Sequence, residues 1–145
     1  MPSSKDSPQP PICNLLALRQ ATRSATALYD RHLAKAGLTT SQHSILTSIA
    51  KRPESSMQDL AEALVMDRTT LLRALQPLTR DGFVRQYPSP QNARRQLLEL
   101  STSGQSKLAE ARVHWQHAQD EFEAAFGTDE ALALRTMLKN VPRPR

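Results

Sequence analysis

The stretch LAEALVMDRTTLLRALQPLTRDGFVRQ, residues 60–86, decides the fold of this chain. It contains an apolar stripe at helical spacing, made of Leu71, Leu75 and Leu78. Asp67 stands directly before this stripe as a good N-cap residue, and Gly82 suits the position just past a helix end. Residues 83–87 then have the aromatic and β-branched content of a strand. We therefore predict a helix over 68–81 followed by a β-strand.

A second, shorter helix is predicted before this one. Ser56 and Asp59 have the spacing of a capping box, and apolar residues from Met57 to Leu64 line one face. On the other side, residues 88–92 read as a turn, and 95–100 as a weak returning strand. Helix, turn, helix and hairpin in this order predict a winged helix-turn-helix.

Further helices are expected on both flanks. One begins near Ile12, with Pro10 and Pro11 in its first turn, and stops at Gly37. Another begins after Thr40 as the N-cap. After the hairpin, Ser101 caps a long helix, and a last helix follows it.

The predicted fold class is mainly α with a small β-hairpin wing. We expect a winged helix-turn-helix DNA-binding lobe over 37–101 and a helical dimerisation region made of 10–36 and 102–145. Residues 1–9 are rich in Pro and Ser and are predicted to form a disordered arm.

The positive charge of the chain is concentrated on the predicted helix over 68–81 and the hairpin that follows it. Residues 68–95 hold six arginines and one acid, Asp81, so this window alone carries the whole net charge of +5. Arginine is well suited to phosphate and guanine contacts. A solvated basic face is the simpler alternative, and the neighbouring elements favour DNA binding over it.

On a helix over 68–81, a polar face lies opposite the leucine stripe. Arg73 is predicted to pair with guanine and Gln76 with adenine. Phosphates or a thymine methyl are expected for Thr69 and Thr70, and phosphates for Arg68 and Arg80. The wing arginines are the remaining DNA-binding candidates: Arg85, Arg94 and Arg95. Pro77 is expected either to kink the helix or to shorten its contact surface.

The chain resembles the MarR family of bacterial regulators over about residues 12–140. The resemblance is carried by residues 37–42, by the run 60–86 and by NARRQLLELSTSG at 92–104. Two positions depart from the family pattern. Gln86 stands where relatives often carry Arg, and Asn92 replaces the acid that precedes the wing arginine.

This resemblance implies a transcriptional regulator that binds double-stranded DNA as a symmetric homodimer on an inverted-repeat operator. It further implies a repressor released by a small phenolic or aromatic effector, which binds between the dimer region and the DNA lobe. His32 and His43 are candidates to line that pocket, with a plain interface role as the alternative. Some relatives sense peroxide through a cysteine of the first helix, with a tyrosine nearby.

Cys13 and Tyr29 make such redox sensing an alternative here. However, counting back from Gly37 places Leu15, and not Cys13, at the sensor position. A winged-helix module that binds protein in place of DNA is a second alternative. His114 and His117 have a zinc-compatible spacing, but two ligands are too few, so no metal or cofactor is expected.

The sequence contains no phosphate-binding glycine loop and no nucleophile elbow, so no enzyme activity is expected. One cysteine, no signal-peptide core and no long apolar run favour a cytoplasmic protein that does not enter a membrane.

Overall fold

The computed structural model describes residues 11–145, so the predicted arm and Pro10 lie outside the described residues. It confirms a mainly α fold with a small β-wing. In chain order the elements are α1 (Asn14–Leu33), the 3-10 turn η1 (Ala34–Ala36), α2 (Thr40–Lys51), β1 (Ser55–Ser56), α3 (Met57–Leu64), α4 (Arg68–Arg80), β2 (Val84–Pro88), β3 (Gln96–Leu100), α5 (Thr102–Phe126) and α6 (Thr128–Leu138).

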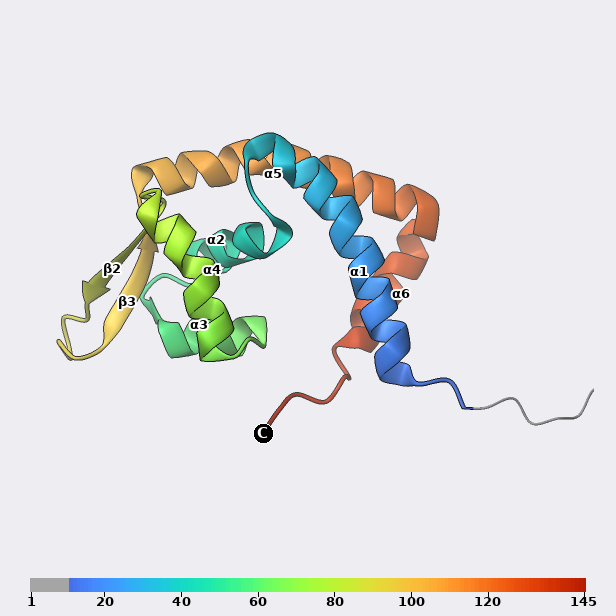
Figure 1. The fold of residues 1–145 in the computed structure, drawn as a ribbon, viewed down its shortest axis with the longest axis horizontal. Coiled ribbons are helices and arrows are strands. Elements are labelled where there is room, and N and C mark those ends of the chain that lie inside the picture. The colour runs from blue at the N-terminus through green and yellow to red at the C-terminus, as the bar shows by residue number, and fades with distance from the viewer. Residues whose placement is uncertain (1–10) are drawn as a thin grey trace, which may run out of the picture.

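Helix α5 spans the molecule, with the winged lobe at one end and α1 and α6 at the other (Figure 1). The core lies in the lobe, where α2, α3 and α4 pack against one another and against the sheet. The largest fully buried side chains are Leu33, Ile45, Leu46, Leu60, Leu71, Leu75, Leu78, Val84 and Leu98. Removing this apolar surface from water is the main stabilising contribution to the lobe.

Side-chain caps fix the helix starts of the lobe much as the sequence predicts. Ser56 and Asp59 form the predicted capping box at α3, and the Asp67 carboxylate accepts the Thr70 backbone N–H at the start of α4. Gly82 follows α4 with φ 78°, the left-handed conformation that glycine adopts without a Cβ clash. These contacts set where α4 begins and ends.

Two predicted helix starts are wrong. Helix α1 begins at Asn14, not in a turn with Pro10 and Pro11, because the Cys13 sulfur accepts the Leu16 N–H and acts as the cap. Helix α2 is capped by Thr39, not Thr40. Gln42, three residues on, returns its side-chain oxygen to the Thr39 N–H, a reciprocal arrangement that is unavailable to Thr40.

The predicted hairpin is present, and a short third strand joins it. Strands β2 and β3 pair antiparallel from Val84 opposite Leu100 to Pro88 opposite Gln96. Strand β1 adds to the other edge of β3, which gives the order β1-β3-β2. Two serines carry no strand pattern, so the sequence did not predict β1. Within residues 11–145, no helix is long and apolar enough to cross a bilayer.

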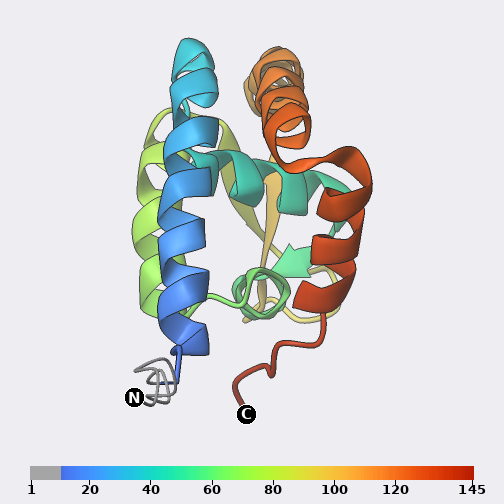
Figure 2. The ribbon, with the colours of Figure 1, turned by 90° about the vertical axis from the view of Figure 1, so that its right-hand side faces the viewer.

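Helices α1 and α6 extend to the same side of α5 (Figures 1 and 2). Both helices leave apolar side chains exposed. The large exposed apolar residues of this terminal region are Ile12, Leu15, Leu16, Leu18, Val113, Phe126, Leu132, Met137, Leu138 and Val141. The lobe exposes only two such residues among those described, Val65 and Leu72. The terminal helices therefore present an apolar surface much larger than that of the lobe.

Candidate nucleic-acid interface

Helix α4 has one buried face and one polar, exposed face. Leu71, Leu75 and Leu78 are each at most 2% exposed, so they hold the helix rigidly against the core. The opposite side is open to solvent and carries Thr69, Arg73, Gln76 and Arg80, while Arg68 is exposed at the start of the helix. This arrangement gives the helix a fixed row of hydrogen-bonding groups, as entry into a major groove requires.

Pro77 does not end the helix. Helix α4 runs from Arg68 to Arg80, and the Asp81 N–H donates to the Pro77 carbonyl at 2.9 Å. Proline lacks only its own N–H, which would have bonded the Arg73 carbonyl, so the turns after it still form. The helix therefore extends to Arg80, whose guanidinium lies 3.3 Å from the Asp81 carboxylate.

Asp67 organises the first turn of α4. Its two carboxylate oxygens accept the Thr70 backbone N–H at 2.8 Å and the Thr70 hydroxyl at 2.7 Å. These hydrogen bonds, the backbone one first, lower the pKa of Asp67. Because the Thr70 hydroxyl proton is used in the cap, Thr69 offers the freer hydroxyl donor of the two candidates.

The wing turn is closed by backbone hydrogen bonds. The Ser89 N–H donates to the Arg95 carbonyl at 2.8 Å, and the Arg95 N–H donates to the Asn92 carbonyl at 2.9 Å. The Asn92 side chain accepts the Arg94 backbone N–H at 3.1 Å. Asn92 thus orders the backbone below Arg94 without pairing with its guanidinium, which remains exposed.

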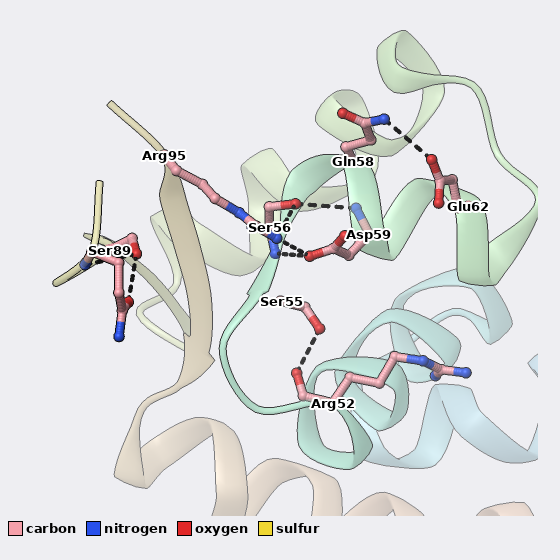
Figure 3. Close-up of polar contacts among 9 residues, drawn as sticks. Arg52, Ser55, Ser56, Gln58, Asp59, Glu62, Ser89 and Arg95 are labelled. Atoms are coloured by element: carbon pink, nitrogen blue, oxygen red, sulfur yellow. Dashed lines mark hydrogen bonds and ion pairs between the residues drawn. The ribbon is translucent and has the colours of Figure 1, made fainter. Parts of the chain in front are cut away.

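Arg95 points away from the wing tip and towards α3. Its guanidinium lies 2.6 Å from the Asp59 carboxylate and contacts the Ser56 hydroxyl at 3.5 Å (Figure 3). The Ser56 backbone and side-chain hydrogen bonds are the largest causes that lower the pKa of Asp59, and Arg95 adds to them. Arg95 therefore ties the wing to the helix-turn-helix, a role that the sequence did not predict.

The six predicted DNA-binding arginines fall into two groups. Arg80, Arg85 and Arg95 pair with the carboxylates of Asp81, Glu99 and Asp59 respectively. Within residues 11–145, no ion pair involves Arg68, Arg73 or Arg94. These three guanidinium groups, two on α4 and one on the wing, have the greatest freedom to contact an anion.

The candidates for binding an effector also fall into two groups, those that line a common cleft and those that lie outside it. Tyr29 and His43 line one cleft of about 310 Å³ between α1, α2 and α5, together with Trp115 and several hydroxyl side chains. Burial lowers the pKa of His43, so the ring favours its neutral form. His32 lies elsewhere on α1, where its Nε2 is 2.5 Å from the Glu121 carboxylate. The structure thus brings Tyr29 and His43 together and leaves His32 outside.

Cys13 lies at the start of α1, exposed, as the helix cap described above. It does not line the cleft that contains Tyr29. Among the residues that the structure describes, no cluster of three or more metal-ligating side chains is found.

Sequence reasoning missed two residues of these sites. Trp115 stacks on His43, with ring centroids 6.3 Å apart, but in the sequence it was visible only as part of an apolar helix face. Asp30 accepts hydrogen bonds from the backbone N–H and the hydroxyl of Thr40 at 2.7 and 2.6 Å. No local pattern signals this contact, because it joins two helices across a turn.

The fold and the exposed face of α4 define a winged-helix DNA-binding protein. A protein-family model described as the MarR family matches residues 38–95. Transcriptional regulator HosA of Escherichia coli O111:H- is 30% identical over 105 residues, which cover 72% of this chain and 76% of HosA. The chain belongs to the MarR family, and it is a transcriptional regulator.

Other relatives have more specific names. The homoprotocatechuate degradative operon repressor of Escherichia coli is 26% identical over 86% of this chain and 84% of that protein. The structure of the transcriptional regulator MosR of M. tuberculosis in complex with DNA aligns with a TM-score of 0.79 and 34% identity, over 89% of this chain and 92% of that one. The repressor CouR bound to a 23-mer DNA duplex aligns with a TM-score of 0.81 and 25% identity, over 88% and 90%.

Proposed function

We propose that this chain is a homodimeric repressor that binds an inverted-repeat operator in double-stranded DNA and is released by a small aromatic effector. The observation that carries the proposal is the division of α4 into three buried leucines and an exposed row of Thr69, Arg73, Gln76 and Arg80. The proposal assigns no catalytic reaction to the chain.

In this proposal α4 enters the major groove and the wing follows the backbone into the adjacent minor groove. Arg73 pairs with guanine and Gln76 with adenine, while Arg68 and Arg80 bind phosphates. Arg94 is the wing residue that enters the minor groove, since Arg95 is held by Asp59. Arg85 contributes less, because Glu99 on the neighbouring strand neutralises it.

The dimer is formed by the terminal region, 10–36 and 102–145. Its exposed apolar side chains on α1, α5 and α6 form a surface that favours burial against a second copy. A twofold dimer presents two α4 helices, which bind half-sites about one helical turn apart. Two relatives support repression by their names, the homoprotocatechuate degradative operon repressor and the repressor CouR.

The effector binds in the cleft of Tyr29, His43 and Trp115. This cleft joins α1 of the terminal region to α2 of the lobe. A ligand there that fits only one relative orientation of the two regions shifts the spacing of the two reading helices. The homoprotocatechuate degradative operon repressor supports an aromatic compound as the ligand class.

Selection of bound sequences from random duplex DNA tests this function. We expect an inverted repeat, and the selected duplex should then bind with a log–log salt slope of about −0.9 for each phosphate contacted. Arg73→Ala should relax the base preference at one position of each half-site, and Arg94→Ala should lower the affinity for all sequences. If no duplex is enriched, or if binding does not respond to salt, the result contradicts the proposal and favours the alternative of a winged-helix module that binds protein.

A further inference from the structure

We propose that residues 141–145, the segment that follows α6, form a further DNA-contacting element in which Arg143 binds a backbone phosphate beside the start of α4. This inference rests on the proposed function, because it extends the same DNA-binding surface. It follows from three features of the segment: its position against the helix-turn-helix, the free hydrogen-bond donors of Arg143 and the acidic residues that this arginine faces.

The segment after α6 returns to the winged lobe. It leaves α6 and runs beneath the lobe towards α3 (Figures 1 and 2). There the Arg143 Nη1 donates a hydrogen bond of 3.3 Å to the Glu62 carbonyl, in the last turn of α3. A cation in this place also meets the negative end of the helix dipole. The contact joins residues 81 positions apart and places Arg143 at the corner between α3 and α4.

Arg143 shares a hollow with the start of α4. The hollow has a volume of about 650 Å³, and both Arg143 and Arg68 line it. Arg68 is the first residue of α4 and one of the proposed phosphate-binding residues, so a phosphate that it binds at this edge lies close to Arg143. Ala61, Val65 and Met66 form an apolar part of the lining. The aliphatic stem of an arginine can lie on such a surface while its charged end stays in water.

Arg143 keeps most of its hydrogen-bonding capacity for a ligand. A guanidinium group has several N–H donors, and the Glu62 carbonyl uses one nitrogen of Arg143. Within residues 11–145, no ion pair involves this arginine, and it is exposed. Pro142 and Pro144 restrict the backbone on both sides of it, so that ordering the segment on DNA costs less conformational entropy.

Arg143 also changes the charge that DNA meets at this corner. Without it, the charged residues that line the hollow are two acids, Glu62 and Asp67, and one base, Arg68. An approaching phosphate would then meet a net negative charge and be repelled. Arg143 balances this charge and adds donors that a phosphate can accept. The corner is therefore compatible with DNA when the segment lies on it.

The matched variants Arg143→Gln and Arg143→Lys test the inference in the intact chain, with the duplex selected above as the probe. Fluorescence anisotropy gives the affinity over a series of salt concentrations. The proposed dimer carries two copies of the segment, so Arg143→Gln should make the log–log salt slope shallower by about 1.8, or about 0.9 for each phosphate lost. At fixed salt, the affinity should fall about fivefold for each contact. The base preference should stay the same, because phosphates carry no sequence information.

Two variants serve as controls. Arg143→Lys keeps the charge and should keep the wild-type slope. Arg112→Gln removes the same charge from an exposed part of α5 and should leave the slope unchanged. Light scattering and thermal unfolding verify that each variant keeps the assembly state and stability of the wild type. An unchanged slope in Arg143→Gln overturns the inference even if the affinity falls, since such a fall shows that Arg143 only ties the segment to α3.

The wild-type protein offers a second measurement that does not depend on the folding of a variant. Phenylglyoxal modifies accessible guanidinium groups, and peptide mass spectrometry identifies the modified residues. The selected duplex should protect Arg143 and leave Arg112 reactive. Equal reactivity of Arg143 with and without the duplex overturns the inference.

Failure of this inference can be told apart from failure of the proposed function. If the wild type selects no duplex, both fail. If the wild type binds the selected duplex with the expected salt dependence and Arg143→Gln retains the same slope, only the role of residues 141–145 is wrong.

Discussion

The winged lobe and the terminal helices differ in how completely they bury their apolar residues. Nine large side chains are fully buried, and eight of them belong to the lobe or its sheet, with Leu33 at the end of α1 as the exception. The terminal region instead exposes Leu15 at 61%, Leu132 at 57% and Met137 at 61%. One region has a complete core within a single chain, whereas the other leaves large apolar side chains exposed to solvent.

The largest effect should come from a cavity in the complete region. Leu75→Ala removes a side chain that is 2% exposed, and it should lower the free energy of unfolding by about 2–5 kcal/mol. The matched change Leu132→Ala, at a site 57% exposed, should act mainly through association. In urea titrations at several protein concentrations, the defect of Leu75→Ala should be constant, and that of Leu132→Ala should depend on concentration. Equal, constant defects would remove the distinction between the regions.

A charge on the incomplete region should break the dimer. Leu132→Asp places a carboxylate in the proposed interface, where burial of an unpaired charge is costly. We expect a monomer by light scattering and about a hundredfold loss of DNA affinity, because one α4 helix then binds alone. Ala50→Asp, on an exposed part of α2, is the control and should remain dimeric. A Leu132→Asp protein that stays dimeric would place the interface elsewhere.

The lobe was predictable from the sequence because its signals are local. Asp67, Gly82 and the leucine stripe of α4 lie within one short stretch, and each determines its own turn or face. Val65 is an exception within that stretch. It closes α3 with φ 53°, a left-handed conformation in which a β-branched side chain is strained, and the sequence showed only a turn there.

Contacts between distant segments were not predictable in this way. Arg95 is predicted to bind DNA because it follows a turn in a basic stretch. Its contact with Asp59, 36 residues earlier, is not visible in that local pattern. The cleft is likewise assembled from α1, α2 and α5, so Trp115 gained its role only from the fold. Periodicity reports which face is buried, but not which side chain it meets.

Within the lobe, free and paired arginines should differ in DNA binding. Arg73→Ala should reduce affinity for the selected duplex about 5- to 150-fold, the factor of a lost bidentate base contact. Arg85→Ala should reduce it less, because Glu99 already neutralises that charge. Gel-shift titrations of both variants at one fixed salt concentration give the comparison, with thermal unfolding to verify the fold. A larger loss in Arg85→Ala would show that the wing strand, and not α4, dominates the interface.

The smallest effect concerns the junction of the two regions, where His43 lies under Trp115. Burial lowers the pKa of His43 below its ordinary value of 6.5. The folded protein therefore favours the neutral ring, and the stability from this site is present above about pH 6.5 and is lost as the pH falls through the lower folded pKa. Unfolding midpoints in urea at about pH 7.5 and 5.5 should fall more in the wild type than in His43→Gln. The same substitution at His117, exposed on α5, is the control and should leave the wild-type pH dependence intact. If His43→Gln retains the full acid sensitivity, protonation of His43 is not the cause of the loss of stability at low pH.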